Sequence, residues 1–345
     1  MRKKICVIDH YFHQNTKPFQ FLIDILQKEY DVDIYWDYTP AGGRHISVDV
    51  INRYEIVFFF QVINPIEELR QIKAKILWLP MYDGTEFNDA YWYKMSFLPI
   101  RILCFCKRLY NYFSKFGFDC AYFKYYCNPS EFPRVRDFSS LRVFFWLREN
   151  IGFNIVMSIL EQSKVDSFDL LLAPDPSYAD FTPHTKIMRQ YNINLHRGFL
   201  NRAQYISLLS RNNIFIAPRR QEGIGMSFLE ALAMGHCVIA HNDATMSEYI
   251  SDKRSGLLFN ANAPSPLDIA NFREIAKASL DVATTGYRNW RDSIGDVLSF
   301  VKQETKSPSR SRTFLDLKYI TKYYPVGVYY KLRHLPDKLQ QIIKI

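Results

Sequence analysis

The order of apolar segments along the chain constrains its fold more than any other feature. In the first half, short apolar runs with the composition of strands alternate with amphipathic stretches of helical length. The strand-like runs are KICVID, VDIYW, EIVFFFQV and ILWLPM, and the helix-like stretches include FQFLIDILQKEY and IEELRQIK. Strands that alternate with helices form a parallel sheet with helices on its faces. The sequence therefore predicts an α/β fold of the doubly wound kind.

The same alternation occurs twice, on either side of a segment rich in residues that break regular structure. The stretch NPSEFPRVRDFSS at 128–140 has the composition of a linker, and a new series of strand-like runs begins with LRVFFWL at 141–147. A chain of 345 residues is also longer than one hydrophobic core usually serves. We therefore expect two Rossmann-like domains, 1–138 and 139–300, that face each other across a cleft, followed by a tail at 301–345.

Composition argues against several other classes of protein. No uncharged apolar stretch reaches roughly 18 residues, so no membrane-spanning helix is predicted. The N-terminal MRKKICVIDHYF has a short apolar part containing Asp9, which suits a first strand better than a signal peptide, and we expect a cytoplasmic protein. The six cysteines include no C-x-x-C pair, so we expect no bound metal. Nothing in the chain resembles a nucleic-acid-binding motif, and nucleic acid is not an expected partner.

Residues 219–235, RRQEGIGMSFLEALAMG, place two glycines where a strand gives way to a helix. The preceding apolar run at 213–218 ends in proline, and the later apolar spacing predicts a helix that begins close to Met226. Gly223 and Gly225 therefore lie in the turn between them. A helix N-terminus presents unpaired N–H groups, and glycines allow a diphosphate to come close to the backbone. The turn is a candidate diphosphate-binding site.

Charged residues flank these glycines. Arg219 and Arg220 carry donors suited to phosphate. Glu222 and Glu230 need another explanation, because carboxylates repel phosphate and accept hydrogen bonds from hydroxyls. The two glutamates could hold the sugars at the two ends of a nucleotide diphosphate sugar. A dinucleotide-binding fingerprint is the alternative, although its third glycine is replaced by Phe228.

The pattern E-G-x-G-x-x-x-x-E-A-x-A-x-G, with its E-x7-E pair, is followed by VIA at 238–240, Glu248 and SGLLF at 255–259. Over about residues 205–260 it resembles the donor-site signature of retaining GT-B glycosyltransferases, close to glycosyltransferase family 4. The resemblance implies a GT-B fold, anomeric retention, a donor site in the C-terminal domain and an acceptor site in the N-terminal domain. It also implies that Glu222 contacts the donor sugar and Glu230 the ribose. Backbone amides that would face the donor belong to Gly225, Met226, Ser227 and Phe228.

A glycosyl transfer needs something to stabilise the departing diphosphate, either a metal ion or fixed cations. The only D-x-D, at 31–33, falls where a helix passes into a strand and is interpreted as a solvated connection. We therefore expect metal-independent transfer with no cofactor. Arg148 is the expected main cation, since the family places an arginine after the first strand of the second domain. The lysine that accompanies it in the family is missing before Gly152, and Arg219 or Arg220 could supply the second charge.

The N-terminal domain departs from the family pattern at two places. The run ILWLPM ends in Tyr82 and Asp83, where relatives place a histidine that meets the donor sugar. We expect Tyr82 or Asp83 to take that position, and we group Asp83 with Glu222 and Arg148 as catalytic candidates; a D-G turn with no functional role is the alternative. The family's glycine-rich loop after the first strand is replaced by DHYFHQNTKPF, in which two histidines, His10 and His13, could face the cleft.

Two segments combine aromatic and basic residues. Residues 91–126 contain fourteen aromatic residues and six basic residues against one acid, and the chain from Lys306 onward carries nine basic residues against two aspartates. An aromatic core explains the first segment, and a brace against the N-terminal domain, frequent in GT-B proteins, explains the tail. The functional interpretation is that both lie on an anionic membrane, where aromatic rings and cations partition.

Together these patterns predict a hexosyltransferase-type glycosyltransferase. It would move a sugar from a nucleotide sugar to a glycan acceptor, expected to be lipid-linked, in surface polysaccharide synthesis such as lipopolysaccharide or capsule. We expect it in the cytoplasm, peripheral to the inner membrane face. Two alternatives remain: a nucleotide-sugar epimerase of the same fold, and a catalytically silent subunit that binds sugar nucleotide for a partner.

Overall fold

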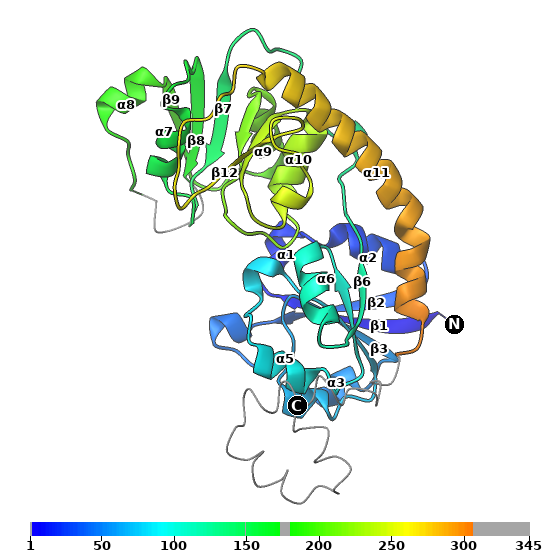
Figure 1. The fold of residues 1–345 in the computed structure, drawn as a ribbon. Coiled ribbons are helices and arrows are strands. Elements are labelled where there is room, and N and C mark those ends of the chain that lie inside the picture. Colours follow the sequence, from blue (N-terminus) through cyan, green and yellow to red (C-terminus); the bar gives the residue numbers. More distant parts are fainter. Residues whose placement is uncertain (1, 149, 173–179, 306–345) are drawn as a thin grey trace, which may run out of the picture.

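The computed structural model describes residues 2–148, 150–172 and 180–305, and in this part of the chain two α/β domains are joined end to end (Figure 1). Each domain is built on a six-stranded sheet in which all neighbouring strands run parallel. The prediction of two doubly wound domains is confirmed. The basic tail from residue 306 onward lies outside the described residues.

The N-terminal sheet has the strand order β2-β1-β3-β4-β5-β6. Its strands are β1 (Lys3–His10), β2 (Tyr30–Asp37), β3 (Ile56–Phe60), β4 (Lys75–Leu79), β5 (Ile100–Cys104) and β6 (Asp119–Tyr122). Every residue of β3 and β5 is buried, as expected for central strands covered by helices on both faces. The connecting helices are α1 (His13–Thr16), α2 (Gln20–Leu26), α3 (Val48–Ile51), α4 (Ile66–Leu69), α5 (Asp89–Met95) and α6 (Lys107–Ser114), with short 3-10 turns η1 (Thr39–Ala41) and η2 (Tyr82–Gly84).

The C-terminal sheet has the strand order β12-β11-β10-β7-β8-β9. Its strands are β7 (Arg142–Trp146), β8 (Ser167–Leu172), β9 (Ile193–Arg197), β10 (Ile214–Ile216), β11 (Cys237–His241) and β12 (Leu257–Phe259). The helices are α7 (Phe153–Leu160), α8 (Thr185–Gln190), α9 (Arg202–Ser210) and α10 (Met226–Met234), with 3-10 turns η3 (Pro129–Glu131) in the linker and η5 (Met246–Glu248). Helix α10 begins at Met226, where the sequence pattern places it.

In each sheet the chain leaves the first strand of the domain to one side and later returns to its other side. This reversal falls between β1 and β3 in the N-terminal sheet and between β7 and β10 in the C-terminal sheet. Ligands of open parallel sheets bind beyond the carboxyl ends of the strands at such a switch point. The topology therefore predicts one binding crevice in each domain, after β1 and β3 and after β7 and β10.

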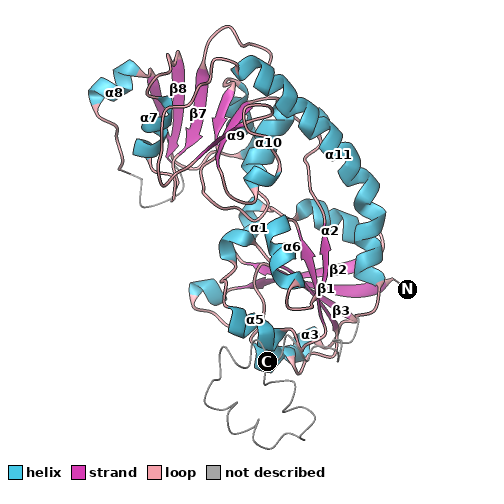
Figure 2. Ribbon diagram, in the orientation of Figure 1, coloured by secondary structure: helices cyan, strands magenta, loops and turns pink. Residues whose placement is uncertain are grey.

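Helix α11 (Phe272–Lys302) runs from the C-terminal domain along the side of the molecule to the N-terminal domain (Figures 1 and 2). Near its start Leu280 packs on Gly235 at the end of α10. Farther along, Trp290 is buried against Phe21 of α2, with ring centroids 5.7 Å apart. Helix α11 therefore braces the N-terminal domain, which is the packing role that the sequence suggests for the tail.

The C-terminal end of α11 is held by a buried arginine of β5. Arg101 is 1% exposed, and its guanidinium donates to the carbonyl oxygens of Phe300 and Gln303, the latter at 2.8 Å. Asp119 of β6 accepts from Arg101 Nε at 2.8 Å, so the buried charge is paired. A cation at the carbonyl end of a helix is stabilised by the helix dipole. Arg101 thus joins α11 to the N-terminal sheet.

The aromatic segment 91–126 contributes mainly to the core of the N-terminal domain. Trp92, Phe113 and Trp78 of β4 form a cluster of stacked and edge-on rings. Eight of its fourteen aromatic side chains are buried, namely Trp92, Phe105, Tyr112, Phe113, Phe116, Phe118, Tyr125 and Tyr126. Phe97, at 49% exposed, is the large aromatic that it presents to solvent. Packing therefore accounts for most of this composition.

Candidate functional site

The two switch points face each other across the cleft between the domains. A cavity of about 470 Å³ lies there, and residues after β1, β3 and β4 form one wall while residues after β7 and β10 form the other. An adjoining hollow of about 490 Å³ shares Asp83, Arg148 and Arg219 with it. Both lie beyond the carboxyl ends of parallel strands, where ligands of this type of sheet bind.

The glycine turn opens the N-terminus of α10 toward this cavity. Gly225 is the N-cap residue of α10 and has a φ of +77°. This left-handed conformation is strained for a residue with a side chain but not for glycine. Gly225, Met226 and Ser227 line the cavity, so the first backbone N–H groups of α10 are placed at its wall. Phe228 turns its ring into the core and is 1% exposed. The local geometry is that of an anion-binding helix N-terminus.

Gly223 has a second neighbour that the sequence did not indicate. A Cβ atom built on Gly223 would lie 1.9 Å from Met81 Sδ and 3.0 Å from Met81 Cβ. Met81 follows β4 in the N-terminal domain, so this glycine lets the two domains approach each other. The lack of a side chain at Gly223, which the sequence pattern associates with diphosphate binding, therefore allows the close contact between the domains.

Glu222 lies at the centre of the cavity wall, partly buried. Burial raises the pKa of its carboxyl to about 7; Arg219 and Arg148 act in the opposite direction, and Asp83 adds to the rise. A carboxylate in such surroundings binds hydroxyl donors strongly, because little water competes. Glu222 is thus a hydrogen-bond acceptor on the cavity wall.

Glu230 is 5% exposed and lies one turn into α10 at the edge of the same cavity. Arg202 Nη1, at the start of α9, donates to Glu230 Oε1 at 2.7 Å. Burial raises the pKa of Glu230, and the ion pair with Arg202 lowers it. Sequence analysis missed Arg202, because a lone arginine at the first position of a helix carries no recognisable signal.

Three arginines that the sequence singled out take different positions. The Arg148 guanidinium lies 4.7 Å from the Trp146 ring centroid and lines both cavities. Arg219 also lines both, and its Nη1 donates to Asp83 Oδ2 at 2.9 Å. Arg220 lines only the adjoining hollow, where its Nε donates to the carbonyl of Asn150 at 2.9 Å. Of these three arginines, Arg148 and Arg219 are therefore the two that line the cavity containing Glu222 and Glu230.

Asp83 and Tyr82 separate in space although they are adjacent in sequence. Asp83 faces the cavity from the N-terminal domain, and burial raises the pKa of its carboxyl while Arg219 lowers it. The Tyr82 side chain is buried, and its hydroxyl lies 3.3 Å from both carboxylate oxygens of Asp243 in the other domain. Tyr82 thus contributes to the domain contact, and its role toward the donor stays a prediction.

Glu248, the third glutamate of the signature, couples the domains. Its carboxylate accepts from the backbone N–H groups of Lys107 at 2.7 Å and Arg108 at 3.1 Å. These groups belong to the first turn of α6, whose N–H groups have no partner within the helix. Glu248 therefore caps a helix of the N-terminal domain from the C-terminal domain.

The D-x-D at 31–33 lies at the amino end of β2, whereas the cleft lies at the carboxyl ends of the strands. Asp33 accepts a hydrogen bond from the hydroxyl of Tyr54 at 2.8 Å. Within the described ranges, no cluster of three or more His, Cys, Asp and Glu side chains is placed to hold a metal ion. None of the helices in the same ranges is long and apolar enough to cross a membrane.

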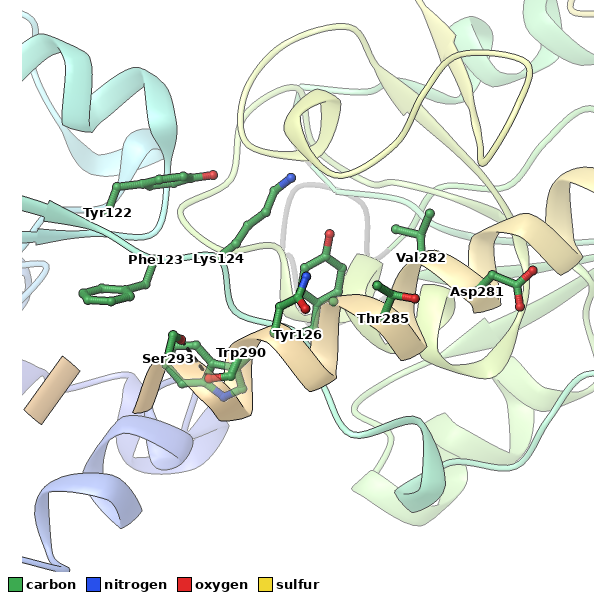
Figure 3. Close-up of a pocket in the computed structure, with 11 residues that line it drawn as sticks. Tyr122, Phe123, Lys124, Tyr126, Asp281, Val282, Thr285, Trp290 and Ser293 are labelled. Atoms are coloured by element: carbon green, nitrogen blue, oxygen red, sulfur yellow. Dashed lines mark hydrogen bonds between the residues drawn. The ribbon is translucent and has the colours of Figure 1, made fainter. Parts of the chain in front are cut away.

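A further hollow of about 600 Å³ lies where the segment after β6 crosses α11 (Figure 3). It is lined by Tyr122, Lys124 and Tyr126 on one side and by residues of α11, among them Asp281 and Trp290, on the other. Gly286 of α11 lies here against the ring of Tyr126, and a Cβ would come within 2.4 Å of it. This hollow is away from the switch points and contains none of the predicted site residues.

Comparison with known proteins agrees with this geometry. Residues 185–271, which include α9 and the glycine turn, match the family model described as glycosyl transferases group 1. An uncharacterized 41.2 kDa protein from the cps region of Klebsiella pneumoniae is 26% identical over 109 residues, and the alignment covers 32% of this chain and 29% of that protein.

Solved structures match over most of the chain. Sucrose-phosphate synthase from Thermosynechococcus elongatus has a TM-score of 0.61 at 12% identity, covering 86% of this chain and 98% of that one. Alr3699/HepE from Anabaena in complex with UDP-glucose has a TM-score of 0.56 at 12% identity, covering 86% of this chain and 100% of that one. The chain therefore has the GT-B glycosyltransferase fold, and its residues 185–271 match the glycosyl transferases group 1.

Proposed function

We propose that this protein transfers a hexose-type sugar from a nucleoside diphosphate sugar to a glycan acceptor. One observation carries the proposal: Glu222, Glu230, Arg148, Arg219 and the N-terminus of α10 line one cavity at the switch point of the C-terminal sheet. Two carboxylates and several cationic donors in one cavity suit a ligand that carries both sugar hydroxyls and a diphosphate.

Each group has a role in the proposed reaction. Glu230 accepts from the ribose hydroxyls, and Glu222 from hydroxyls of the donor sugar. The amides of α10, Arg148 and Arg219 hold the diphosphate, and they act most strongly as its negative charge grows in the transition state. The transfer proceeds without a metal ion and retains the anomeric configuration, as the family resemblance implies.

The acceptor is a glycan carried on lipid, and the process is surface polysaccharide synthesis. The cps-region relative supports this setting. In this proposal the protein lies at the inner face of the cytoplasmic membrane, held by the basic tail. Co-sedimentation of the intact protein and of a chain truncated after Ser309 with anionic and neutral vesicles tests the location. Equal sedimentation with neutral and anionic vesicles, unaffected by salt or truncation, would contradict the proposed membrane location.

The decisive experiment compares ligand binding with turnover. Calorimetry with UDP, GDP and their glucose, galactose and mannose conjugates should show binding that Glu230→Ala weakens. Donor consumption should require a glycan acceptor and survive EDTA. Conversion of the donor alone into an epimer would favour the epimerase, and donor binding without turnover on any acceptor would favour the silent subunit. Failure to bind every nucleotide would overturn the proposal.

A further inference from the structure

The N-terminal wall of the cavity carries the exposed ring of Phe12 beside His13, and the stacked rings of Tyr11 and Tyr38 lie outside the cavity lining. We propose that Phe12, Tyr11 and Tyr38 form a platform on which a pyranose ring of the acceptor stacks, and that His13 accepts a hydrogen bond from its hydroxyl. This subsite rests on the proposed function and specifies which residues receive the acceptor. The loop that carries most of it, residues 10–19, stands where the family has a glycine-rich loop.

The platform is a stack of rings between the ends of β1 and β2. Tyr11 and Tyr38 have ring centroids 5.2 Å apart and an interplanar angle of 23°, and His10 stacks on Tyr11 at 4.9 Å. Gln14 Nε2 donates to the hydroxyl of Tyr38 at 2.8 Å, which ties α1 to the turn after β2. These contacts give the rings of Tyr11 and Tyr38 fixed orientations, as a binding surface requires.

Two of these rings are unusually open to solvent. Phe12 is 44% exposed and Tyr38 is 47% exposed, whereas Phe19 in the same loop is 1% exposed. Exposed large apolar side chains that gather beside a polar cavity are typical of ligand-binding surfaces. A pyranose suits this surface, because its C–H face packs on an aromatic ring while its hydroxyls stay at the edge.

The platform continues into the donor cavity. Phe12 and His13 line the same cavity as Glu222 and Ser227, from the opposite domain. Gln61, directly after β3, also lines it, so this wall is the switch-point crevice of the N-terminal sheet. A sugar stacked on Phe12 would therefore share one cavity with the sugar that Glu222 is proposed to hold.

His13 is oriented by a buried carboxylate. Its Nδ1 lies 2.7 Å from Asp9 Oδ1, and Asp9 is 2% exposed. Since Asp9 occupies Nδ1, a ligand in the cavity can use only Nε2. With Asp9 ionised, Nδ1 carries the proton and Nε2 presents a lone pair that accepts from a hydroxyl. Burial raises the pKa of Asp9, and the bond with His13 opposes that rise.

The test separates acceptor binding from donor binding. Saturation-transfer NMR measures contact of methyl and octyl glycosides of glucose, galactose and N-acetylglucosamine with the full-length protein in the presence of UDP. Phe12→Ala and Tyr38→Ala should weaken glycoside binding by about three- to tenfold each, the range of one aromatic contact. His13→Gln should weaken it as well. Calorimetry with UDP-glucose runs in parallel on every variant.

Phe97→Ala is the matched control, since Phe97 is similarly exposed in the same domain but packs on Tyr93 and belongs to neither the cavity lining nor the ring stack of Tyr11 and Tyr38. Loss of glycoside signal in the platform variants, with UDP-glucose binding and the Phe97→Ala signal intact, supports the subsite. Equal signals in all variants, or no glycoside signal from the wild type, would overturn it. Failure of UDP-glucose and every other nucleotide sugar to bind counts against the proposed function instead.

Discussion

Arg202 Nη1 lies 2.7 Å from Glu230 Oε1, and this ion pair joins the start of α9 to α10 at the edge of the donor cavity. The glutamate is buried and the arginine side chain is 60% exposed, so the cation can move while the carboxylate cannot. Ribose hydroxyls that reach Glu230 must share it with Arg202 or displace it. The pair therefore limits the hydrogen bonds that Glu230 can offer to a ligand in the cavity.

Removing each glutamate should separate two parts of the donor. Glu230→Ala should weaken binding of free UDP by about ten- to hundredfold, the value of hydrogen bonds to a charged group. Glu222→Ala should leave UDP binding nearly unchanged and lower turnover, because it contacts the sugar that UDP lacks. Calorimetry and initial rates give both quantities. The opposite order of UDP affinities would contradict the assignment.

Glu222 should make stability depend on pH. Its pKa is raised to about 7 in the folded protein from an ordinary value of 4.5, so the folded state binds the proton more tightly than the unfolded state does. This contribution is fully present below pH 4.5 and is lost as pH rises through about 7. Relative to Glu222→Gln, the wild-type melting temperature should therefore fall between pH 5 and 8. If the melting temperatures of the two proteins changed with pH in parallel across that range, the proposed effect of burial on the Glu222 pKa would be refuted.

Arg148 should act on the rate more than on affinity. Negative charge on the departing diphosphate grows toward the transition state, so Arg148→Ala should lower kcat by roughly tenfold to a thousandfold and raise the Kd for UDP much less. Arg220→Ala is a control from the neighbouring hollow, because Arg220 bonds to Asn150 and Asn262. Equal losses of UDP affinity and kcat in Arg148→Ala would mean that it serves binding alone.

The contact between Met81 and Gly223 predicts a compensating pair of substitutions. Gly223→Ala brings a Cβ against Met81 and should hold the domains apart, which lowers kcat. Met81→Ala removes the obstructing side chain, so the double variant should recover activity beyond the product of the single effects. Gly225→Ala should not be rescued by Met81→Ala, because its strain comes from a φ of +77°. If the effects of the two single substitutions on kcat simply multiplied in the double variant, the contact between Met81 and Gly223 would be excluded.

Arg101 should control the attachment of α11 to the N-terminal domain. Arg101→Met leaves Asp119 without its partner and removes the guanidinium donor from the carbonyls of Phe300 and Gln303, at a cost of about 3 kcal/mol. Thermal unfolding should show a clear fall in the melting temperature, whereas Arg291→Ala on the exposed face of the same helix should change it little. An unchanged Arg101→Met midpoint would show that helix packing suffices.

Local patterns in the sequence determined the α/β class, the two-domain division and the start of α10. These features depend on short-range patterns, because short apolar runs typical of strands alternate with stretches of helical spacing. Gly225, before α10, adopts a left-handed conformation that would be strained for a residue with a side chain. The donor glutamates could be proposed for the same reason, since their spacing is fixed within one turn and one helix.

Only the tertiary structure decided which side chains meet at the candidate site and between the domains. The pairing of Arg202 with Glu230, and the approach of Met81 to Gly223, join residues far apart in the sequence that carry no local signal. The same holds for α11, whose end is held by Arg101 from β5, and for residues 91–126, in which eight of the fourteen aromatic side chains are buried. Long-range packing selects among contacts that local composition allows equally, so composition alone could not distinguish an aromatic core from a membrane face.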